Sequence, residues 1–83
     1  MMNEERAIAT WEEIWRRLFH YETHQGPKPF FSLTKLRTTY AQDLFDSGCL
    51  FKIRIGRRRQ TVVMAWPSRV QAWIRLKVER GEL

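Results

Sequence analysis

The sequence is poor in cysteine and has no long apolar run. Its 83 residues include one cysteine, Cys49, which excludes a disulfide within the chain, and no cluster of cysteine and histidine has the spacing of a zinc site. Acidic residues among the first five, and no apolar stretch of about 20 residues, argue against a signal peptide and a membrane span. We therefore expect a cytoplasmic protein in a reducing compartment, with neither a disulfide nor a bound metal.

Residue patterns that support catalysis are also missing. Ser32, Ser47 and Ser68 lack the surroundings of a nucleophilic serine, and Cys49 has no histidine near it in the sequence. No glycine-rich loop of the kind that cradles phosphates occurs, and no pair of carboxylates stands where a pocket is expected. The sequence therefore predicts a protein that is not an enzyme and needs no cofactor.

Charge is distributed unevenly along a chain that is long enough for one small domain, residues 1–83. Residues 1–22 hold three Arg and five Glu, a net charge of −2, whereas residues 28–80 hold twelve basic and three acidic residues, a net charge of +9. The formal net charge of the whole chain is +6. A basic surface confined to the C-terminal three-quarters indicates nucleic acid as a partner, more than a membrane.

The stretch from Leu50 to Trp66 has the alternation of a β-hairpin around a Gly-Arg-Arg-Arg tip. If Arg57 and Arg58 form the loop, Ile53 lies opposite Val62. One face then carries only apolar side chains, those of Phe51, Ile53, Ile55, Val62, Met64 and Trp66. The other face pairs Lys52 with Val63 and Arg54 with Thr61. Because two strands alone are marginally stable, we expect helices to cover the apolar face and to leave the basic face and tip in water.

Residues 10–22 are predicted to form an amphipathic helix, preceded by a frayed segment, residues 1–9. Thr10 to Glu13 has the form of a capping box. A single apolar stripe follows at helical spacing, formed by Trp11, Ile14, Trp15, Leu18 and Phe19. Most of this stripe is expected in the core, and Trp11 and Trp15 are the candidate contact for a protein partner. Residues 23–31 are then expected to be an extended connector, because of their prolines.

A second helical tract runs from about Ser32 to Ser47 and stops at Gly48. It allows two interpretations: one helix, or a short helical turn followed by a new helix that starts at Thr38 or Thr39. The second interpretation would place Arg37, Thr38, Thr39 and Gln42 at a helix N-terminus, where phosphates bind and base edges can be reached.

A last helix is expected after the hairpin. Ser68 to Gln71 again has the form of a capping box, and Gly81 can close the helix. Trp73 and Ile74 are expected to cover the apolar face of the hairpin.

This order of elements resembles the winged helix-turn-helix of the excisionase and MerR-like DNA-binding families, over about residues 32–76. The residues that carry the resemblance are Ser47-Gly48-Cys49-Leu50, Ile53-Arg54-Ile55-Gly56-Arg57-Arg58-Arg59 and Val70-Gln71-Ala72-Trp73-Ile74. In those families a recognition helix ends at a Ser-Gly-x-Leu turn, a wing with a Gly-Arg-Arg tip follows, and a helix with Ala-Trp-Ile or Ala-Trp-Leu packs behind. The first helix of the motif is either a shortened Ser32–Leu36 or the helix from Thr10.

The resemblance implies an α+β, mainly α, fold: a winged helix-turn-helix core, residues 32–80, with helices packed on a two-stranded β-hairpin wing. It also implies a small, nucleoid-associated protein that binds duplex DNA, either a recombination directionality factor of a mobile element or a transcriptional regulator. The expected DNA contacts are Arg37, Thr38, Thr39, Gln42, Lys52, Arg54, Arg57, Arg58 and Arg59. A second copy, or a recombinase or regulatory protein, would be its protein partner. Two other classes remain open: an RNA-binding module that uses the same hairpin, and an adaptor that uses Trp11 and Trp15.

Overall fold

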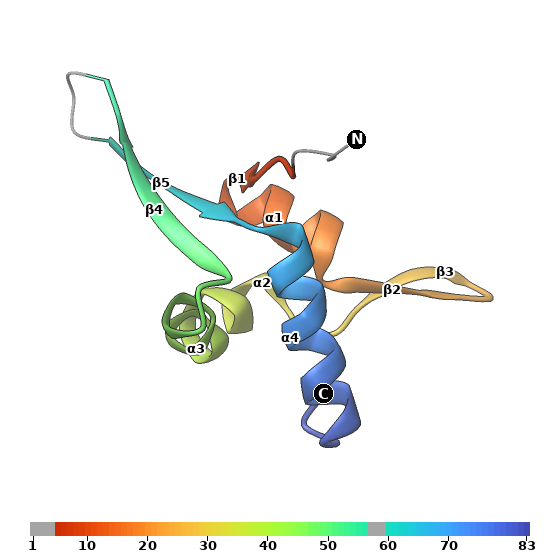
Figure 1. Cartoon of the computed structure of the whole chain (residues 1–83). Helices are drawn as coiled ribbons and strands as arrows, with labels where there is room; N and C mark the ends of the chain where they lie inside the picture. The colour runs from red at the N-terminus through yellow and green to blue at the C-terminus, as the bar shows by residue number, and fades with distance from the viewer. Residues whose placement is uncertain (1–4, 57–59) are drawn as a thin grey trace.

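Two antiparallel sheets and three helical segments make up the part of the chain that the computed structural model describes, residues 5–56 and 60–83 (Figure 1). In chain order the elements are β1 (Ile8–Ala9), α1 (Trp11–Leu18), β2 (His20–Thr23), β3 (Gly26–Pro29), α2 (Leu33–Lys35), η1 (Leu36–Tyr40), α3 (Ala41–Asp46), β4 (Leu50–Ile55), β5 (Gln60–Ala65) and α4 (Pro67–Glu79). The domain is therefore of the α+β class. No helix in these residues has the length and apolar character needed to cross a membrane.

The predicted register of the β4–β5 hairpin is confirmed. Ile53 lies opposite Val62, and Lys52 lies opposite Val63. The same register pairs Phe51 with Met64 and Arg54 with Thr61. Strand β5 also pairs with β1 on its other side, so the sheet has the order β1-β5-β4. The hairpin tip, Arg57 to Arg59, lies outside the described residues.

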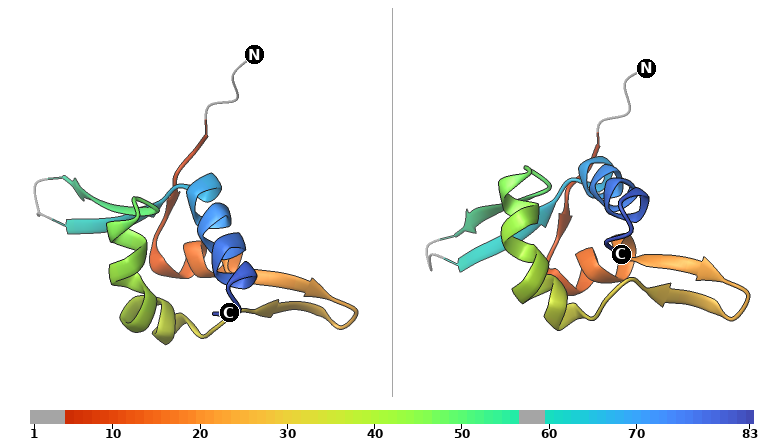
Figure 2. Two further views of the ribbon diagram at one scale, coloured as in Figure 1. Left: turned by 60° about the horizontal axis from the view of Figure 1, so that its bottom comes forward. Right: turned by 90° about the horizontal axis from the view of Figure 1, so that it is seen from below.

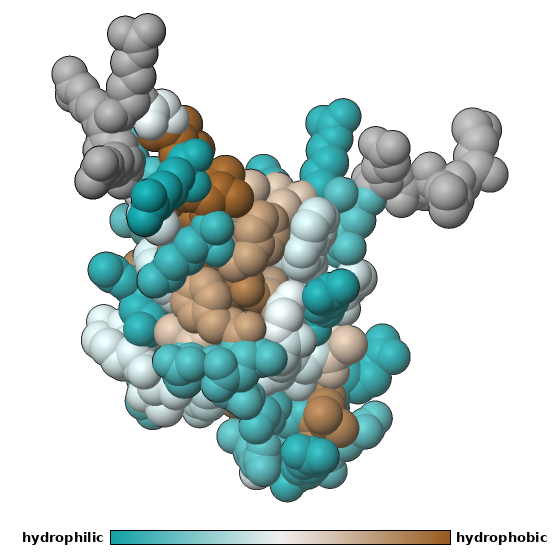
Figure 3. All heavy atoms as spheres, turned by 60° about the vertical axis from the view of Figure 1, so that its left-hand side comes forward, coloured by the Kyte–Doolittle hydropathy of each residue, from teal (hydrophilic) through white to brown (hydrophobic). Residues whose placement is uncertain are grey.

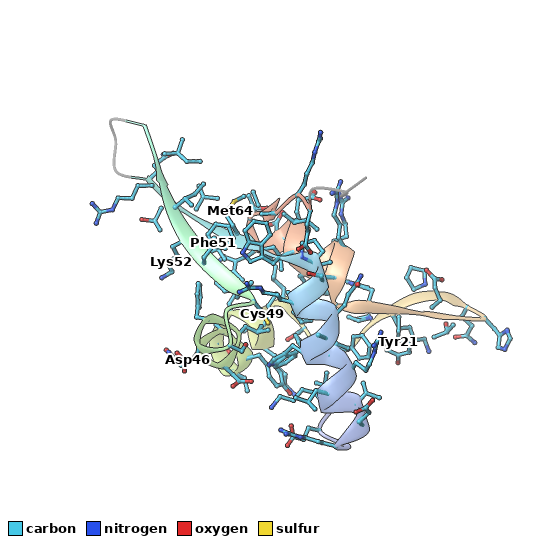
Figure 4. The ribbon with its side chains drawn as sticks, in the orientation of Figure 1. Tyr21, Asp46, Cys49, Phe51, Lys52 and Met64 are labelled. Atoms are coloured by element: carbon cyan, nitrogen blue, oxygen red, sulfur yellow. The ribbon has the colours of Figure 1, made fainter. Side chains whose placement is uncertain are left out.

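The prediction of which hairpin face is covered is wrong. The buried side chains are Leu50, Val63 and Ala65, on the face expected to be basic and exposed, and α1 and α3 contact the strands there. The opposite face keeps Phe51, Ile53, Val62 and Met64 half-buried and Ile55 52% exposed. Figure 4 shows Phe51 and Met64 on one side of the hairpin and Lys52 on the other. Near the base of the hairpin, both faces carry apolar side chains. The face that becomes buried is the one that packs against the helices.

The N-terminal segment is more ordered than predicted. Residues 8 and 9, expected to be frayed, form β1, and Thr10 donates its N–H to the carbonyl of Val63. Thr10 also caps α1 as predicted, because its hydroxyl accepts a hydrogen bond from Glu13 N–H at 3.4 Å. The Glu13 side chain does not complete the capping box, since its carboxylate pairs with Arg16 and Arg17. The helix ends at Leu18, four residues before its predicted end.

Residues 20–29, expected to be a helix end and a connector, form a second β-hairpin. Strands β2 and β3 pair with Thr23 opposite Gly26, which leaves a loop of two residues. The Thr23 hydroxyl donates to the carbonyl of Gly26 at 2.6 Å and accepts from Gln25 N–H at 3.2 Å, so it closes the turn. This ribbon and the β4–β5 hairpin extend from opposite sides of the body (Figure 2).

The tract from Leu33 to Asp46 is a single helix with a π-helical turn, η1, in its middle. Lys35, Leu36 and Ala41 all have right-handed helical backbone angles, so no second helix begins at Thr38 or Thr39. The N-cap is Ser32, whose hydroxyl accepts from Lys35 N–H at 3.2 Å. The helix stops at Gly48 as predicted. Gly48 has a φ of 79°, and Cys49 N–H donates to the carbonyl of Leu44.

Helix α4 packs on the core through Val70 and Trp73 and runs away from strands β4 and β5 (Figure 1). Trp73, expected to cover the hairpin, instead packs edge-on against Phe19 and Tyr40. The predicted Ser68 cap is also wrong, because Pro67 opens the helix and the Glu5 carboxylate accepts hydrogen bonds from the N–H and hydroxyl of Ser68. The core side chains form one cluster, drawn from all three helical segments and the larger sheet.

Candidate nucleic-acid interface

The helix Leu33–Asp46 presents a continuous polar side to solvent. Leu36, Ala41 and Leu44 are buried on its inner side. The exposed residues are Thr34, Lys35, Arg37, Thr38, Thr39, Gln42, Asp43 and Asp46. Because the π-helical turn adds a residue to one turn, Arg37, Thr38 and Thr39 all lie on the outer surface. The structure therefore brings together the four residues predicted to read DNA from this tract, along the side of a helix and not at its start.

Two of these residues already make hydrogen bonds within the helix. The Thr38 hydroxyl donates to the carbonyl of Thr34 at 2.7 Å, and the Gln42 amide donates to the Asp46 carboxylate at 2.9 Å. Both bonds are at the surface, where water or a ligand can replace them. The Gln42 carbonyl and the Thr38 lone pairs stay available as acceptors.

The basic side chains of β4 lie on the same side of the molecule as this helix. Lys52 extends over the ring of Phe45 in α3, with its ammonium nitrogen 5.3 Å from the ring centroid. Arg54 follows two residues later on the same face of β4 and is exposed. The contact between Lys52 and Phe45 therefore joins the hairpin and the helix into one surface. Figure 3, which turns the left-hand side of Figure 1 forward, shows brown and tan spheres that run from the hairpin into the body, with teal side chains around them.

Four cations on this surface are free to meet an anion. Within residues 5–56 and 60–83, Lys35, Arg37, Lys52 and Arg54 make no ion pair, whereas Arg16 and Arg17 pair with Glu13. The negative charge of Asp43 on this helix is partly neutralised. Its carboxylate accepts a hydrogen bond from Trp73 Nε1 at 2.7 Å and lies 3.6 Å from Lys77 Nζ. The surface formed by the exposed helix side and the basic face of β4 is called the basic surface below.

The three tip arginines, Arg57, Arg58 and Arg59, lie outside the described residues. Their expected role in DNA binding stays a prediction from the sequence.

The tryptophans predicted to bind a protein partner are both half-buried and used within the domain. Trp15 Nε1 donates to the carbonyl of Phe31 at 2.8 Å, and the Trp15 ring meets His20 edge-on. Trp11 meets Phe45 edge-on, with ring centroids 6.2 Å apart. Each ring therefore helps to fix α1 against neighbouring elements, and a role in partner binding stays a prediction.

Cys49 is buried between the end of α3 and α4. Its thiol donates to the carbonyl of Arg69 at 3.3 Å, and burial raises the pKa of this thiol above its ordinary value. A protonated, enclosed thiol is a poor nucleophile and a poor metal ligand. No group of three or more His, Cys, Asp and Glu side chains is placed to hold a metal ion within the two described ranges.

The partial exposure of the apolar outer face of the β4–β5 hairpin was not predicted from the sequence. Its signal was present in Leu50, Val63 and Ala65, which make the other face apolar too.

Comparison of the chain with family models, with curated proteins and with solved structures finds no match.

Proposed function

We propose that this protein binds duplex DNA through the basic surface, as a winged helix-turn-helix domain. The observation that carries the proposal is the Lys52–Phe45 contact, which sets a basic strand beside the exposed polar side of a 14-residue helical tract, Leu33–Asp46. A helix of this kind fits the major groove, and a neighbouring basic hairpin reaches phosphates beside it.

The order of the elements supports this assignment. Helix α1 takes the place of the first helix of the motif, the helix Leu33–Asp46 takes that of the recognition helix, and β4–β5 takes that of the wing. The β2–β3 ribbon stands where the motif has its turn. Pairing of β1 with β5, at Met64 and Ala65, joins the base of the wing to the segment that leads into α1.

The chemistry of the side chains divides their roles. Arg37, Thr39 and Gln42 carry donors and acceptors suited to base edges, and Lys35, Lys52 and Arg54 are suited to phosphates. The tip arginines would add phosphate or minor-groove contacts. By the resemblance given above, a recombination directionality factor or a small transcriptional regulator is the cellular role that we propose.

Binding of labelled duplex DNA, measured by fluorescence anisotropy over a range of salt concentrations, tests the proposal. The double variant Lys35→Gln/Arg37→Gln should weaken binding, because it removes one phosphate contact, at Lys35, and one base contact, at Arg37. Loss of the phosphate contact should lower the slope of log K against log salt by about 0.9. Changing all three tip arginines to Gln should lower the slope further.

The matched control is Arg75→Gln/Arg80→Gln, which removes the same charge from exposed positions of α4 and its C-cap. Its affinity should stay close to that of the unaltered protein. An equal loss for both double variants would show that only net charge matters. Tighter binding to single-stranded or hairpin RNA in direct competition would support the RNA-binding class instead.

A further inference from the structure

The β2–β3 ribbon has no role in the proposed DNA contact, although it extends well away from the body. It consists of two strands, a size that is marginally stable alone. Tyr21 is 43% exposed on it, with its ring tilted over that of Phe30 at a centroid distance of 4.9 Å. Such a ribbon carries two sheet edges, and each edge is a template for another strand unless something blocks it.

The hydrogen-bond pattern shows which backbone groups face outward. Phe30 N–H donates to the carbonyl of Phe19 at 2.9 Å, so the Phe19 carbonyl faces β3 at the base of the ribbon, whereas Phe19 N–H donates back to the carbonyl of Trp15 in α1. Hydrogen-bonded and non-hydrogen-bonded pairs alternate along antiparallel strands. By this alternation Tyr21 bonds to Lys28 inside the ribbon. The backbone groups of His20 and Glu22 therefore point away from β3.

The two edges of the ribbon differ. On β3, the outward positions opposite His20 and Glu22 are Pro29 and Pro27, which have no N–H to offer. On β2, the same alternation turns the N–H groups of His20 and Glu22 outward, and within residues 5–56 and 60–83 neither donates to a backbone carbonyl outside the ribbon. One edge is thus closed to a further strand, and the other is open.

We propose that the open edge of β2 is a self-association surface, through which two copies of this chain pair antiparallel about a two-fold axis at Tyr21. The axis places Tyr21 beside Tyr21 of the second copy, and His20 beside Glu22 of the second copy. Both His20–Glu22 pairs have outward backbone groups, so the register forms four main-chain hydrogen bonds.

Side-chain chemistry and closure both favour a second copy over another partner. On one face of the paired strands each Glu22 carboxylate lies beside His20 of the other copy, whose Nε2 is the ring nitrogen left for it because Nδ1 lies 3.0 Å from the carbonyl of Trp15. On the opposite face the two Tyr21 rings lie together. The result is a four-stranded sheet whose outer edges are the two proline-blocked β3 strands. Assembly therefore ends at a dimer and does not continue into a fibre.

Sedimentation velocity over a range of protein concentrations tests this inference. The unaltered protein should be a concentration-dependent dimer. Glu22→Pro removes an outward N–H but no bond within the ribbon, and it should raise the dimer dissociation constant roughly tenfold or more. The matched control, Glu22→Gln, keeps the N–H and should remain dimeric. Circular dichroism of both variants checks that the fold is retained.

A cysteine pair tests the register. The non-hydrogen-bonded geometry expected at Tyr21 places its two Cα atoms about 4.5 Å apart, within the range of a disulfide. Tyr21→Cys should therefore form a disulfide-linked dimer under mild oxidation, whereas the exposed Lys28→Cys on β3 should not. A monomer at all concentrations, a dimer that Glu22→Pro leaves intact, or equal cross-linking of the two cysteine variants would overturn the inference.

Dimerisation through β2 does not depend on DNA binding, so an experiment can contradict either one without the other. A monomer that binds duplex DNA would contradict only the dimer. A dimer with no affinity for duplex DNA would contradict only the proposed function.

Discussion

At the scale of single residues, the contact between Asp43 and Trp73 ties the proposed recognition helix to α4. The indole N–H of Trp73, a residue only 6% exposed, has the Asp43 carboxylate as its acceptor. Asp43→Ala should lower the free energy of unfolding by about 1–2 kcal/mol, because it leaves that N–H without a partner. Urea denaturation measures the loss. Asp43→Asn keeps an oxygen acceptor and should lose less.

Asp46→Ala is the control for this prediction, since Asp46 is exposed and bonds only to the Gln42 amide among the described side chains. Its effect should stay within about 0.5 kcal/mol. Equal losses at the two positions would mean that the Trp73 hydrogen bond does not stabilise the fold.

The backbone conformation of Gly48 can be tested by substitution. Its φ of 79° is unfavourable for any residue with a Cβ, and a Cβ there would lie 2.9 Å from Arg69 Nη1. Gly48→Ala should therefore cost about 1–2 kcal/mol of unfolding free energy. Thermal or urea unfolding of Gly48→Ala with and without Arg69→Ala separates the two causes. If the backbone angle dominates, the cost remains when the arginine side chain is removed.

At the scale of elements, adjacent valines of β5 test which hairpin face belongs to the core. Val63 is 8% exposed and Val62 is half-buried on the opposite face. The isosteric change Val63→Thr should cost about 1–3 kcal/mol, because it buries a hydroxyl among apolar side chains. Val62→Thr should cost about 0.5 kcal/mol or less. Urea unfolding compares the two variants, and a larger loss at Val62 would restore the face predicted from the alternation.

The β4–β5 hairpin also shows how far the sequence could predict an element. Its alternation with a period of two gave the strands and their register, because each follows from local spacing. The buried face did not follow, because Leu50, Val63 and Ala65 are as apolar as the residues between them, and only the position of the helices decides between the two sets. The sequence did not predict the β2–β3 ribbon, because its His24-Gln25 loop has no dipeptide typical of a tight hairpin turn. Its prolines also indicated an irregular connector and not a pair of strands.

The candidate site was predictable in part for similar reasons. The sequence singles out Arg37, Thr38, Thr39 and Gln42 because hydroxyl, amide and guanidinium groups stand close together. It misplaces them at a helix start, because a capping-box pattern is local and the packing of Leu36, Ala41 and Leu44 into the core keeps the helix continuous. The link between Lys52 and Phe45 joins residues of two elements and depends on the tertiary fold.

At the scale of the whole molecule, the two hairpins extend from opposite sides of one small core, and the proposed DNA and dimer contacts are accordingly separate (Figure 2). A ligand that binds only the folded chain stabilises the entire domain, because it draws the unfolding equilibrium toward the native state. Duplex DNA should therefore raise the melting temperature even though it touches only the basic surface.

The size of this stabilisation follows from the affinity. At a free DNA concentration of about 100 times the dissociation constant, the stabilisation is about 2.7 kcal/mol, or a rise of about 10–20 °C for a domain of this length. Differential scanning fluorimetry with and without duplex measures the rise. At the same DNA concentration, a tenfold weaker Lys35→Gln/Arg37→Gln variant should show about half of it, and Arg75→Gln/Arg80→Gln should show all of it. Equal shifts for both variants would place the bound DNA elsewhere than on the basic surface.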